Sequence, residues 1–269
     1  MTKGSGVGHS KLQITHAMVK VRFPGCNVED RGTYCIARGL LSRRQLEQAD
    51  AYFGGAGVQA KVASAMVNET GSDARKRRRS RVAFLDVRER PWLFRRLAGI
   101  SKACDAAKFR RLKYRASDGR VQPRYDELQY AEYHGSEGGH FATWHLDAHE
   151  GGSDDEDQRE LAVVLMLSPS KAFTGGRLEV KRGRGGANPG SLVTPGLVGK
   201  RLVDNVKLEA GDAVVFPAKK VWHRVTKTRS GLRRTVVFWV SSAPGGGDGG
   251  GGGKEGGAGS GFDPGSDSD

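Results

Sequence analysis

A succession of short apolar runs, separated by Gly, Pro, Asn and Asp, fills the sequence from Asp126 onwards. Closely spaced strands with turn signals between them are typical of an all-β barrel or sandwich. The clearest turns are Gly175-Gly176 and Gly211-Asp212. The predicted strands are Glu127–Tyr133, Phe141–Leu146, Leu161–Leu167, Arg177–Lys181, Ala213–Phe216, Val221–Val225 and Thr235–Val240.

The region before these runs carries helix signals. Ser42 is a suitable N-cap residue, and Gln45 three residues later completes a capping box ahead of apolar residues at helical spacing. A second helix is predicted from about Pro91, because proline suits the first turn of a helix. Apolar residues then recur on one side of it, at Trp92, Leu93, Leu97 and Ile100.

The last segment of the chain differs in composition from the rest. From Gly245 to Asp269 it holds 13 of the 40 glycines, five acidic residues and one lysine, so it cannot bury enough apolar surface to offset its ordering entropy. We therefore predict a loose N-terminus (1–17), a support region of helices and strands (18–125), a β core (126–243) and a disordered tail (244–269).

The chain's net charge of +14 includes −4 from this tail, which leaves about +18 on the body.

Membrane, secreted and disulfide-rich classes of protein do not fit this sequence. No apolar run approaches the roughly 20 residues that cross a bilayer, and the N-terminus lacks the apolar stretch of a secretory signal. Cys26, Cys35 and Cys104 are odd in number and form no CxxC pair, which argues against a disulfide scaffold or zinc ribbon. We expect an intracellular protein, cytoplasmic or nuclear, with no membrane partner.

A strongly basic run, Arg75–Arg81, has six basic residues in seven. Such a run can act as a nuclear-import signal or contact an anionic partner such as nucleic acid. The alternative is a solvated loop that leads into a strand at Val82–Leu85. No aromatic residue is interleaved with the run, so the stacking platform of a single-strand binder is missing, and the nucleic-acid partner is less favoured.

Two potential metal ligands, His145 and Asp147, lie two residues apart at the end of the predicted strand Phe141–Leu146. Residues i and i+2 of a strand share one face, so the imidazole and the carboxylate point the same way. His223, in a later β-branched run, is the best candidate for a third ligand. Two histidines and one carboxylate with open positions are the arrangement typical of non-haem Fe(II), whereas structural zinc usually takes four N/S ligands.

A predicted anion site follows His223 by ten residues. In the strand around Arg233, alternation places Arg233, Thr235, Val237 and Trp239 on one face and turns Arg234 to the other. A guanidinium that points inward among small and apolar neighbours can bind a carboxylate through two hydrogen bonds. Arg234 is predicted to be a surface charge.

These motifs together resemble the Fe(II)/2-oxoglutarate-dependent dioxygenase superfamily, specifically the prolyl 4-hydroxylase α-subunit-like catalytic domain. The resemblance runs from about Gln129 to Val240. The matching pieces, in order, are Leu128–Tyr133, Phe141–Asp147, Arg159 with Leu161–Ser168, Phe173–Leu178, Leu208–Pro217, His223–Val225 and Gly231–Trp239.

The resemblance implies a double-stranded β-helix (jelly-roll) with N-terminal helices packed on one sheet, mainly β and α+β overall. It implies that His145, Asp147 and His223 bind Fe(II), that Arg233 binds the distal carboxylate of 2-oxoglutarate, and that Tyr133 lies beside this co-substrate. It further implies O₂ as oxidant, succinate and CO₂ as products, and ascorbate to restore over-oxidised iron. The implied reaction is hydroxylation of an amino-acid or peptidyl side chain, with proline the first candidate.

Two alternative functions stay open at this point. A nucleic-acid dealkylating dioxygenase would suit the basic body, but dealkylases of this superfamily carry a second arginine six residues after the co-substrate arginine, where this chain has Trp239. The other alternative is a non-catalytic β-barrel that binds metal and a partner of the basic run. This alternative is motivated by the strand segment Val164–Leu167, which offers no polar side chain to help Arg233 bind the distal carboxylate of 2-oxoglutarate.

Overall fold

The structure is a computed structural model that describes residues 23, 25–67, 78–112, 123–149, 158–181 and 203–241. The predicted loose N-terminus (1–17), residues 75–77 of the basic run, the acidic run 154–157 and the tail 244–269 lie outside the described residues.

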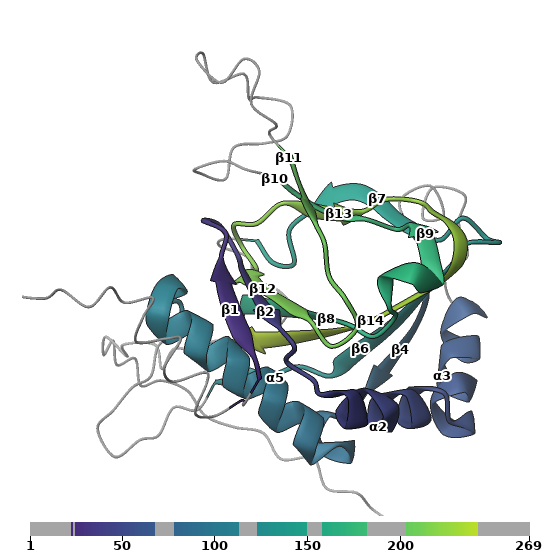
Figure 1. Cartoon of the computed structure of the whole chain (residues 1–269), viewed down its shortest axis with the longest axis horizontal. Coiled ribbons are helices and arrows are strands. Elements are labelled where there is room, and N and C mark those ends of the chain that lie inside the picture. The colour runs from purple at the N-terminus through teal and green to yellow at the C-terminus, as the bar shows by residue number, and fades with distance from the viewer. Residues whose placement is uncertain are drawn as a thin grey trace, which may run out of the picture.

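The described strands form two antiparallel sheets that face each other (Figure 1). The strands of the larger sheet are β1 Asn27–Asp30, β2 Cys35–Arg38, β4 Arg81–Leu85, β5 Arg124–Tyr125, β6 Leu128–His134, β8 Arg159–Met166, β9 Phe173–Gly175, β12 Ala213–Pro217 and β14 Thr228–Ser241. Their order is β1-β2-β12-β8-β14-β6-β4, with β5 and β9 paired to β14. The strands of the smaller sheet are β3 Arg78–Arg79, β7 His140–His145, β10 Leu178–Lys181, β11 Val203–Val206 and β13 His223–Val225. Their order is β11-β10-β13-β7-β3.

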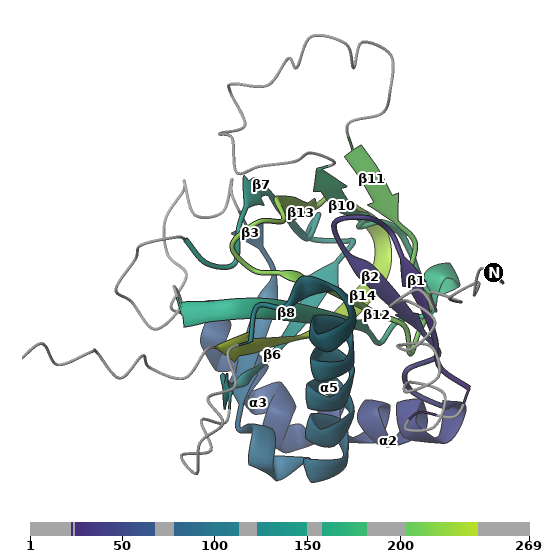
Figure 2. The ribbon, with the colours of Figure 1, turned by 90° about the vertical axis from the view of Figure 1, so that its left-hand side faces the viewer.

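Helices cover the face of the larger sheet that points away from the smaller sheet (Figures 1 and 2). The α-helices are α2 Arg43–Phe53, α3 Ala56–Val67 and α5 Pro91–Cys104, and the shorter helices are η1 Val87–Glu89, η2 Asp105–Phe109 and η4 Ser170–Ala172. The capping box is formed, since Ser42 accepts from the Gln45 backbone N–H and the Gln45 side chain accepts from the Ser42 backbone N–H. Pro91 opens α5 as predicted. No helix within the described residues is long and apolar enough to cross a membrane.

The larger sheet is buried on both faces, which explains the continuous apolar run in β8. Leu161, Val163 and Leu165 pack in the cluster shared with the helices. Ala162, Val164 and Met166 pack in a second cluster between the two sheets. A strand with two buried faces loses the alternation of apolar and polar residues and reads as one apolar block.

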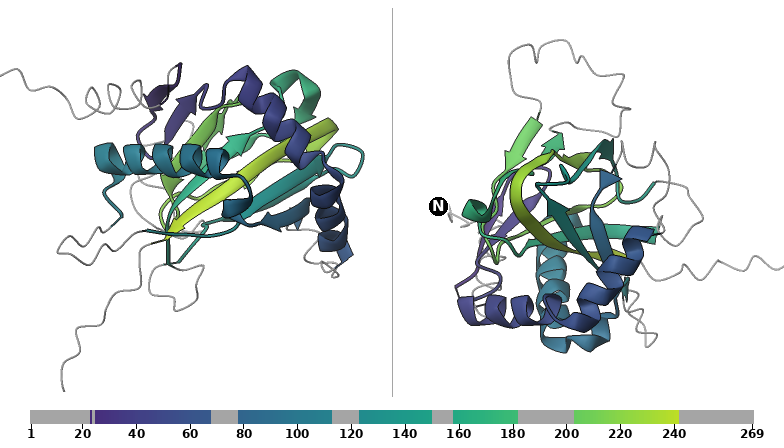
Figure 3. Two further views of the ribbon diagram at one scale, coloured as in Figure 1. Left: turned by 90° about the horizontal axis from the view of Figure 1, so that it is seen from below. Right: turned by 90° about the vertical axis from the view of Figure 1, so that its right-hand side faces the viewer.

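Some elements carried no sequence signal strong enough to predict them. These are α3, the hairpin β1–β2, and the early part of β14, which begins at Thr228 rather than Thr235. Ser230-Gly231 suggests a turn, yet Gly231 lies within the strand at φ +72° and pairs with Phe173 of β9. In the left-hand view of Figure 3, β14 (yellow-green) runs alongside its neighbouring strands, with helices on the viewer's side of the sheet. The strands β1 to β4 of the predicted support region hydrogen-bond within the same two sheets as the predicted core.

Candidate active site

The predicted metal-ligand side chains lie together at the mouth of the jelly-roll. β13 pairs with β7 so that His223 lies directly opposite His145, and Asp147 follows β7 by two residues. Asp147 Oδ1 lies 3.8 Å from His145 Nε2 and 3.6 Å from His223 Nε2. One ligand atom from each of the three residues lies within 4.8 Å of the others. This separation lets all three atoms bind one divalent ion.

Backbone carbonyls orient both imidazoles towards this point. His145 Nδ1–H donates to the carbonyl of Thr143, and His223 Nδ1–H donates to the carbonyl of Val221, each at 3.0 Å. This leaves the Nε2 atom of each ring on the side that faces Asp147. Burial, followed by repulsion from His223, lowers the pKa of His145 from 6.5 to about 4, so its ring is neutral at pH 7. A neutral imidazole is the form that binds metal.

Asp147 has one oxygen that nothing within the described residues satisfies. Its Oδ2 atom is buried and has no hydrogen-bond partner there. A buried, unpartnered carboxylate oxygen is unfavourable unless a cation or donor reaches it. Two neutral imidazoles and one carboxylate are also the donor set preferred by non-haem Fe(II). The residues present therefore fit the metal that the sequence resemblance implies.

Arg233 lies deeper in the same cavity and is 1% exposed. Its Nε, Nη1 and Nη2 atoms are all buried, and none has a hydrogen-bond partner among the residues described. Burial lowers the pKa of the Arg233 guanidinium. An arginine stays protonated in proteins, so a positive charge is buried here without an anion from the described residues to balance it. A carboxylate ligand would satisfy this guanidinium.

Tyr133 and Gly176 shape the space around Arg233. Tyr133 is paired with Arg233 across β6 and β14, and its ring centroid lies 5.0 Å from the guanidinium carbon. Gly176 has φ +56°, and a Cβ atom there would lie 3.0 Å from Arg233 Cδ and 2.8 Å from Thr228 Oγ1. The Thr228 hydroxyl is buried and has no hydrogen-bond partner in the described part of the chain. Sequence reasoning missed Thr228, which lies in the part of β14 that was not predicted.

The cavity lined by His145, Asp147, His223, Arg233 and Tyr133 has a volume of about 260 Å³. Trp239 lines it, and so do three residues that sequence reasoning did not select: Arg78, Phe84 and Gln129. Arg78 belongs to the basic run Arg75–Arg81, whose residues the sequence does not distinguish from one another. Only the pairing of the strands decides which of these arginines turns inward. Arg234, predicted to be a surface charge, instead forms an ion pair with Asp50 of α2 at 2.8 Å, with its side chain 21% exposed.

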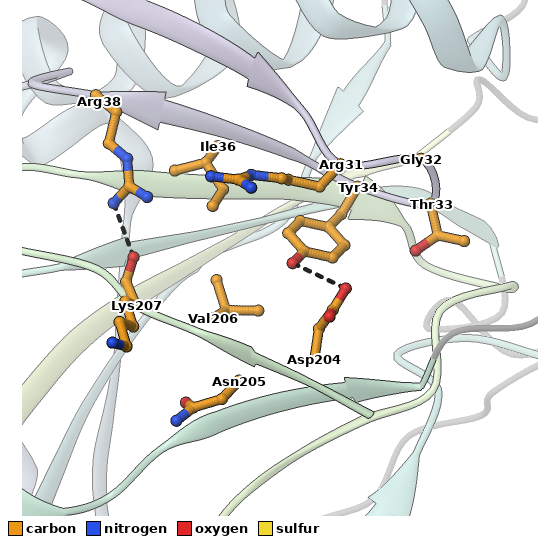
Figure 4. A pocket seen from close by; sticks show the side chains of 10 residues that line it. All are labelled: Arg31, Gly32, Thr33, Tyr34, Ile36, Arg38, Asp204, Asn205, Val206 and Lys207. Carbon is orange, nitrogen blue, oxygen red and sulfur yellow. Dashed lines mark hydrogen bonds between the residues drawn. The ribbon is translucent and has the colours of Figure 1, made fainter. Parts of the chain in front are cut away.

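A second cavity, of about 670 Å³, lies between the β1–β2 hairpin and β11 (Figure 4). Arg31 and Arg38 in its wall both contact Glu29, and Arg38 also pairs with Asp212 at 2.8 Å. Tyr34 donates to Asp204 across the cavity at 3.3 Å. Its lining contains no histidine or cysteine, so it offers no comparable metal-ligand set.

Comparisons with known proteins show which family this segment of the chain is similar to. Residues 128–241 match the family described as the 2OG-Fe(II) oxygenase superfamily, and the predicted resemblance is thereby confirmed for this segment. A PKHD-type hydroxylase of Hyphomonas neptunium is 34% identical over 100 residues, which is 37% of this chain and 37% of the relative. A PKHD-type hydroxylase of Cupriavidus pinatubonensis is 32% identical over 83 residues, or 31% of this chain and 28% of the relative. The matches thus span about a third of the length of these relatives.

A solved structure supports the fold. The non-haem α-ketoglutarate-dependent epimerase SnoN from nogalamycin biosynthesis superposes with a TM-score of 0.51 at 16% identity, covering 86% of this chain and 81% of SnoN. The predicted mainly β, double-stranded β-helix fold with helices on one sheet is confirmed.

Proposed function

We propose, from the similarity of residues 128–241 to the 2OG-Fe(II) oxygenase superfamily, that this protein is an Fe(II)- and 2-oxoglutarate-dependent dioxygenase. It hydroxylates a substrate C–H bond and releases succinate and CO₂. One observation carries the proposal: the buried guanidinium of Arg233, which has no partner among the described residues, shares a cavity with a cluster of two histidines and a carboxylate. One part of the cavity can hold a divalent metal and the other a carboxylate, as a chelating keto acid requires.

His145, Asp147 and His223 would hold Fe(II), and Arg233 would hold the distal carboxylate of 2-oxoglutarate beside Tyr133. When bound, the metal and keto acid supply the oxidising chemistry, with O₂ as oxidant. The carbonyls of Thr143 and Val221 keep each imidazole in the tautomer that presents Nε2. Apolar side chains on the cavity wall, at Val164, Leu178 and Val225, limit the access of water. Ascorbate would keep the iron reduced.

The substrate is proposed to be an amino-acid or peptidyl side chain, with proline as the first candidate. The names of the curated relatives, PKHD-type hydroxylases, support hydroxylation as the reaction. Nucleic acid gains no support from the described part of the basic run. Arg79 donates to the carbonyl of Glu137, Arg81 pairs with the Glu137 carboxylate, and Arg78 turns into the cavity.

The proposal is tested by adding 2-oxoglutarate to the anaerobic Fe(II) form of the full chain. We expect a metal-to-ligand charge-transfer band to appear, and succinate to form once O₂ is admitted. A non-catalytic metal-binding barrel would bind Fe(II) but show neither signal. Loss of the band in the presence of Fe(II) would therefore contradict the enzyme and favour the barrel.

Gly176→Ala is expected to weaken 2-oxoglutarate binding by about tenfold while leaving Fe(II) binding intact. The added Cβ would press on Arg233 Cδ and Thr228 Oγ1, and a shift of the guanidinium by a few tenths of an ångström loses aligned hydrogen bonds. The measurement is the 2-oxoglutarate dependence of the charge-transfer band.

The matched control for this change is Gly32→Ala. Gly32 also has a positive φ, +83°, but nothing lies within 4 Å of its Cβ position. Both variants should lose about 1 kcal/mol of folding stability through the left-handed backbone, and Gly176→Ala alone should change the co-substrate affinity. Equal affinities for 2-oxoglutarate in the two variants would remove Gly176 from the co-substrate site.

A further inference from the structure

Three arginines line the cavity of the proposed active site, and they differ in how their charge is balanced. Arg233 lies at the bottom and is assigned above to the co-substrate. Arg159 donates to Asp126 at 2.7 Å and stacks on the Trp239 ring at 3.9 Å. Arg78 has no carboxylate partner within the part of the chain that the structure describes.

Arg78 is held in place by neutral groups. Its Nε atom donates to Ser80 Oγ at 2.7 Å, and its Nη2 atom donates to Gln129 Oε1 at 3.0 Å. The guanidinium carbon lies 5.0 Å from the Phe141 ring centroid, and that ring stacks on His145 at 3.7 Å. These contacts fix the guanidinium on Phe141, which in turn stacks on the candidate ligand His145, and Nη1 makes no hydrogen bond to a described residue.

Three other arginines nearby each have an acidic partner, which Arg78 lacks among the described residues. Arg81 pairs with Glu137, Arg224 pairs with Glu179 at 2.8 Å, and Arg234 pairs with Asp50 at 2.8 Å. At Arg78 the equivalent position is filled by the neutral amide of Gln129, which is 8% exposed. A fixed, partly desolvated guanidinium in a cavity binds a planar carboxylate more strongly than it would in open water.

An apolar surface lies next to this cation. Phe84 is the large hydrophobic residue that the described chain leaves exposed, at 47%, and it lines the same cavity. It lies opposite Gln129 in the pairing of β4 with β6. The cavity thus presents an exposed ring from β4 of the larger sheet and a positive charge from β3 of the smaller sheet, which suits a ligand with an apolar part and one negative charge.

We propose that Arg78 binds a carboxylate of the primary substrate and that Phe84 packs against the apolar part of that substrate. The substrate is therefore an acidic amino-acid compound or an acidic peptide. This inference rests on the proposed function, and it adds a specificity-determining residue to it. Of the three arginines described in this cavity, Arg159 is paired with Asp126 and Arg233 is assigned to the co-substrate, so Arg78 is left to match one carboxylate rather than a polyanion.

Benzoate is the probe, because it combines one carboxylate with one ring, and benzamide is its neutral counterpart. Each is titrated into the anaerobic Fe(II) form loaded with 2-oxoglutarate, so that Arg233 is already occupied, and binding is read from the change in the charge-transfer band and from calorimetry. We expect benzoate to bind more tightly than benzamide. Arg78→Gln should weaken benzoate binding by about tenfold and leave benzamide unchanged.

Two further variants keep this test independent of folding defects. Gln129→Glu supplies an internal carboxylate to Arg78 and should weaken benzoate to the same degree although every arginine remains. Arg79→Gln removes the neighbouring arginine of β3, whose side chain donates to a surface carbonyl, and should leave benzoate binding unchanged. Equal binding of benzoate by the parent and by Arg78→Gln, or no preference for benzoate over benzamide, overturns the inference.

Calorimetry on the metal-free Arg233→Met variant separates this inference from the proposed function. Benzoate then binds without Fe(II) or 2-oxoglutarate, and its dependence on Arg78 is read directly, even where no charge-transfer band forms. If a peptide with blocked termini and an internal glutamate displaces benzoate, the substrate carboxylate that Arg78 binds belongs to a side chain. Displacement by free proline alone assigns it to an α-carboxylate, and displacement by neither overturns the inference.

Discussion

His223→Ala is expected to lower succinate formation by about 10³-fold or more and to abolish stable Fe(II) binding. His223 supplies one of the three atoms that converge within 4.8 Å. It is 5% exposed, so a side chain from the protein surface cannot reach the site to replace it. With two ligands left, the ion would lose several kcal/mol of binding free energy and the geometry that catalysis needs. Fe(II) affinity and succinate release by the same preparation are the measurements.

His140→Ala is the matched control for this experiment. His140 lies on β7, the strand of His145, but its Nδ1–H donates to the carbonyl of Gly138 at 2.8 Å, and it is absent from the ligand cluster. The control should bind Fe(II) and form succinate at close to the parent rate. Full turnover in His223→Ala would show that the three side chains do not act as one metal site.

The pair of His145 and Asp147 could be predicted from sequence because the two residues lie two positions apart, with His145 ending β7 and Asp147 just beyond it. The i, i+2 spacing of His145 and Asp147 fixes a common face without any tertiary information. His223 needed more, since only the pairing of β13 with β7 brings it opposite His145. From the residues it was the best candidate for a third ligand, and the family resemblance then implied the same role. Arg233 followed from strand alternation in the same way, and its face was assigned correctly.

Residues whose role depends on pairing between distant, weakly patterned segments could not be predicted. Arg78 turns inward because β3 pairs with β7 and sets Arg78 opposite Phe141, and nothing in a run of six basic residues distinguishes it from Arg79. Arg234 was placed on the correct face but with the wrong surroundings, because the sequence does not show that α2 covers that face and brings Asp50 to it. Helix α3 has apolar residues without a clear periodic stripe, so its packing partner decides its structure.

Arg233→Met is expected to have opposite effects on stability and on co-substrate binding. In the absence of 2-oxoglutarate, the variant should be more stable than the parent by about 1–4 kcal/mol in free energy of unfolding, because methionine fills similar space without a buried, unpaired charge. The affinity for 2-oxoglutarate should fall by about 10²–10³-fold, since the charge-assisted hydrogen bonds to the distal carboxylate are lost. Urea unfolding with and without 2-oxoglutarate, in the presence of Fe(II), measures both effects.

Arg234→Met is the control for Arg233→Met, because it removes an arginine of the same strand whose charge is already paired. Arg234 is the next residue of β14, points to the opposite face, and has a carboxylate partner in Asp50. Its replacement should lower stability slightly, by up to about 1 kcal/mol, and leave 2-oxoglutarate binding intact. In the parent, 2-oxoglutarate at a hundred times its Kd should add about 2.7 kcal/mol of stability, and in Arg233→Met it should add almost none. If Arg233→Met were instead strongly destabilised, the guanidinium would already be balanced within the fold, and the cavity would have no unmet need for an anionic co-substrate.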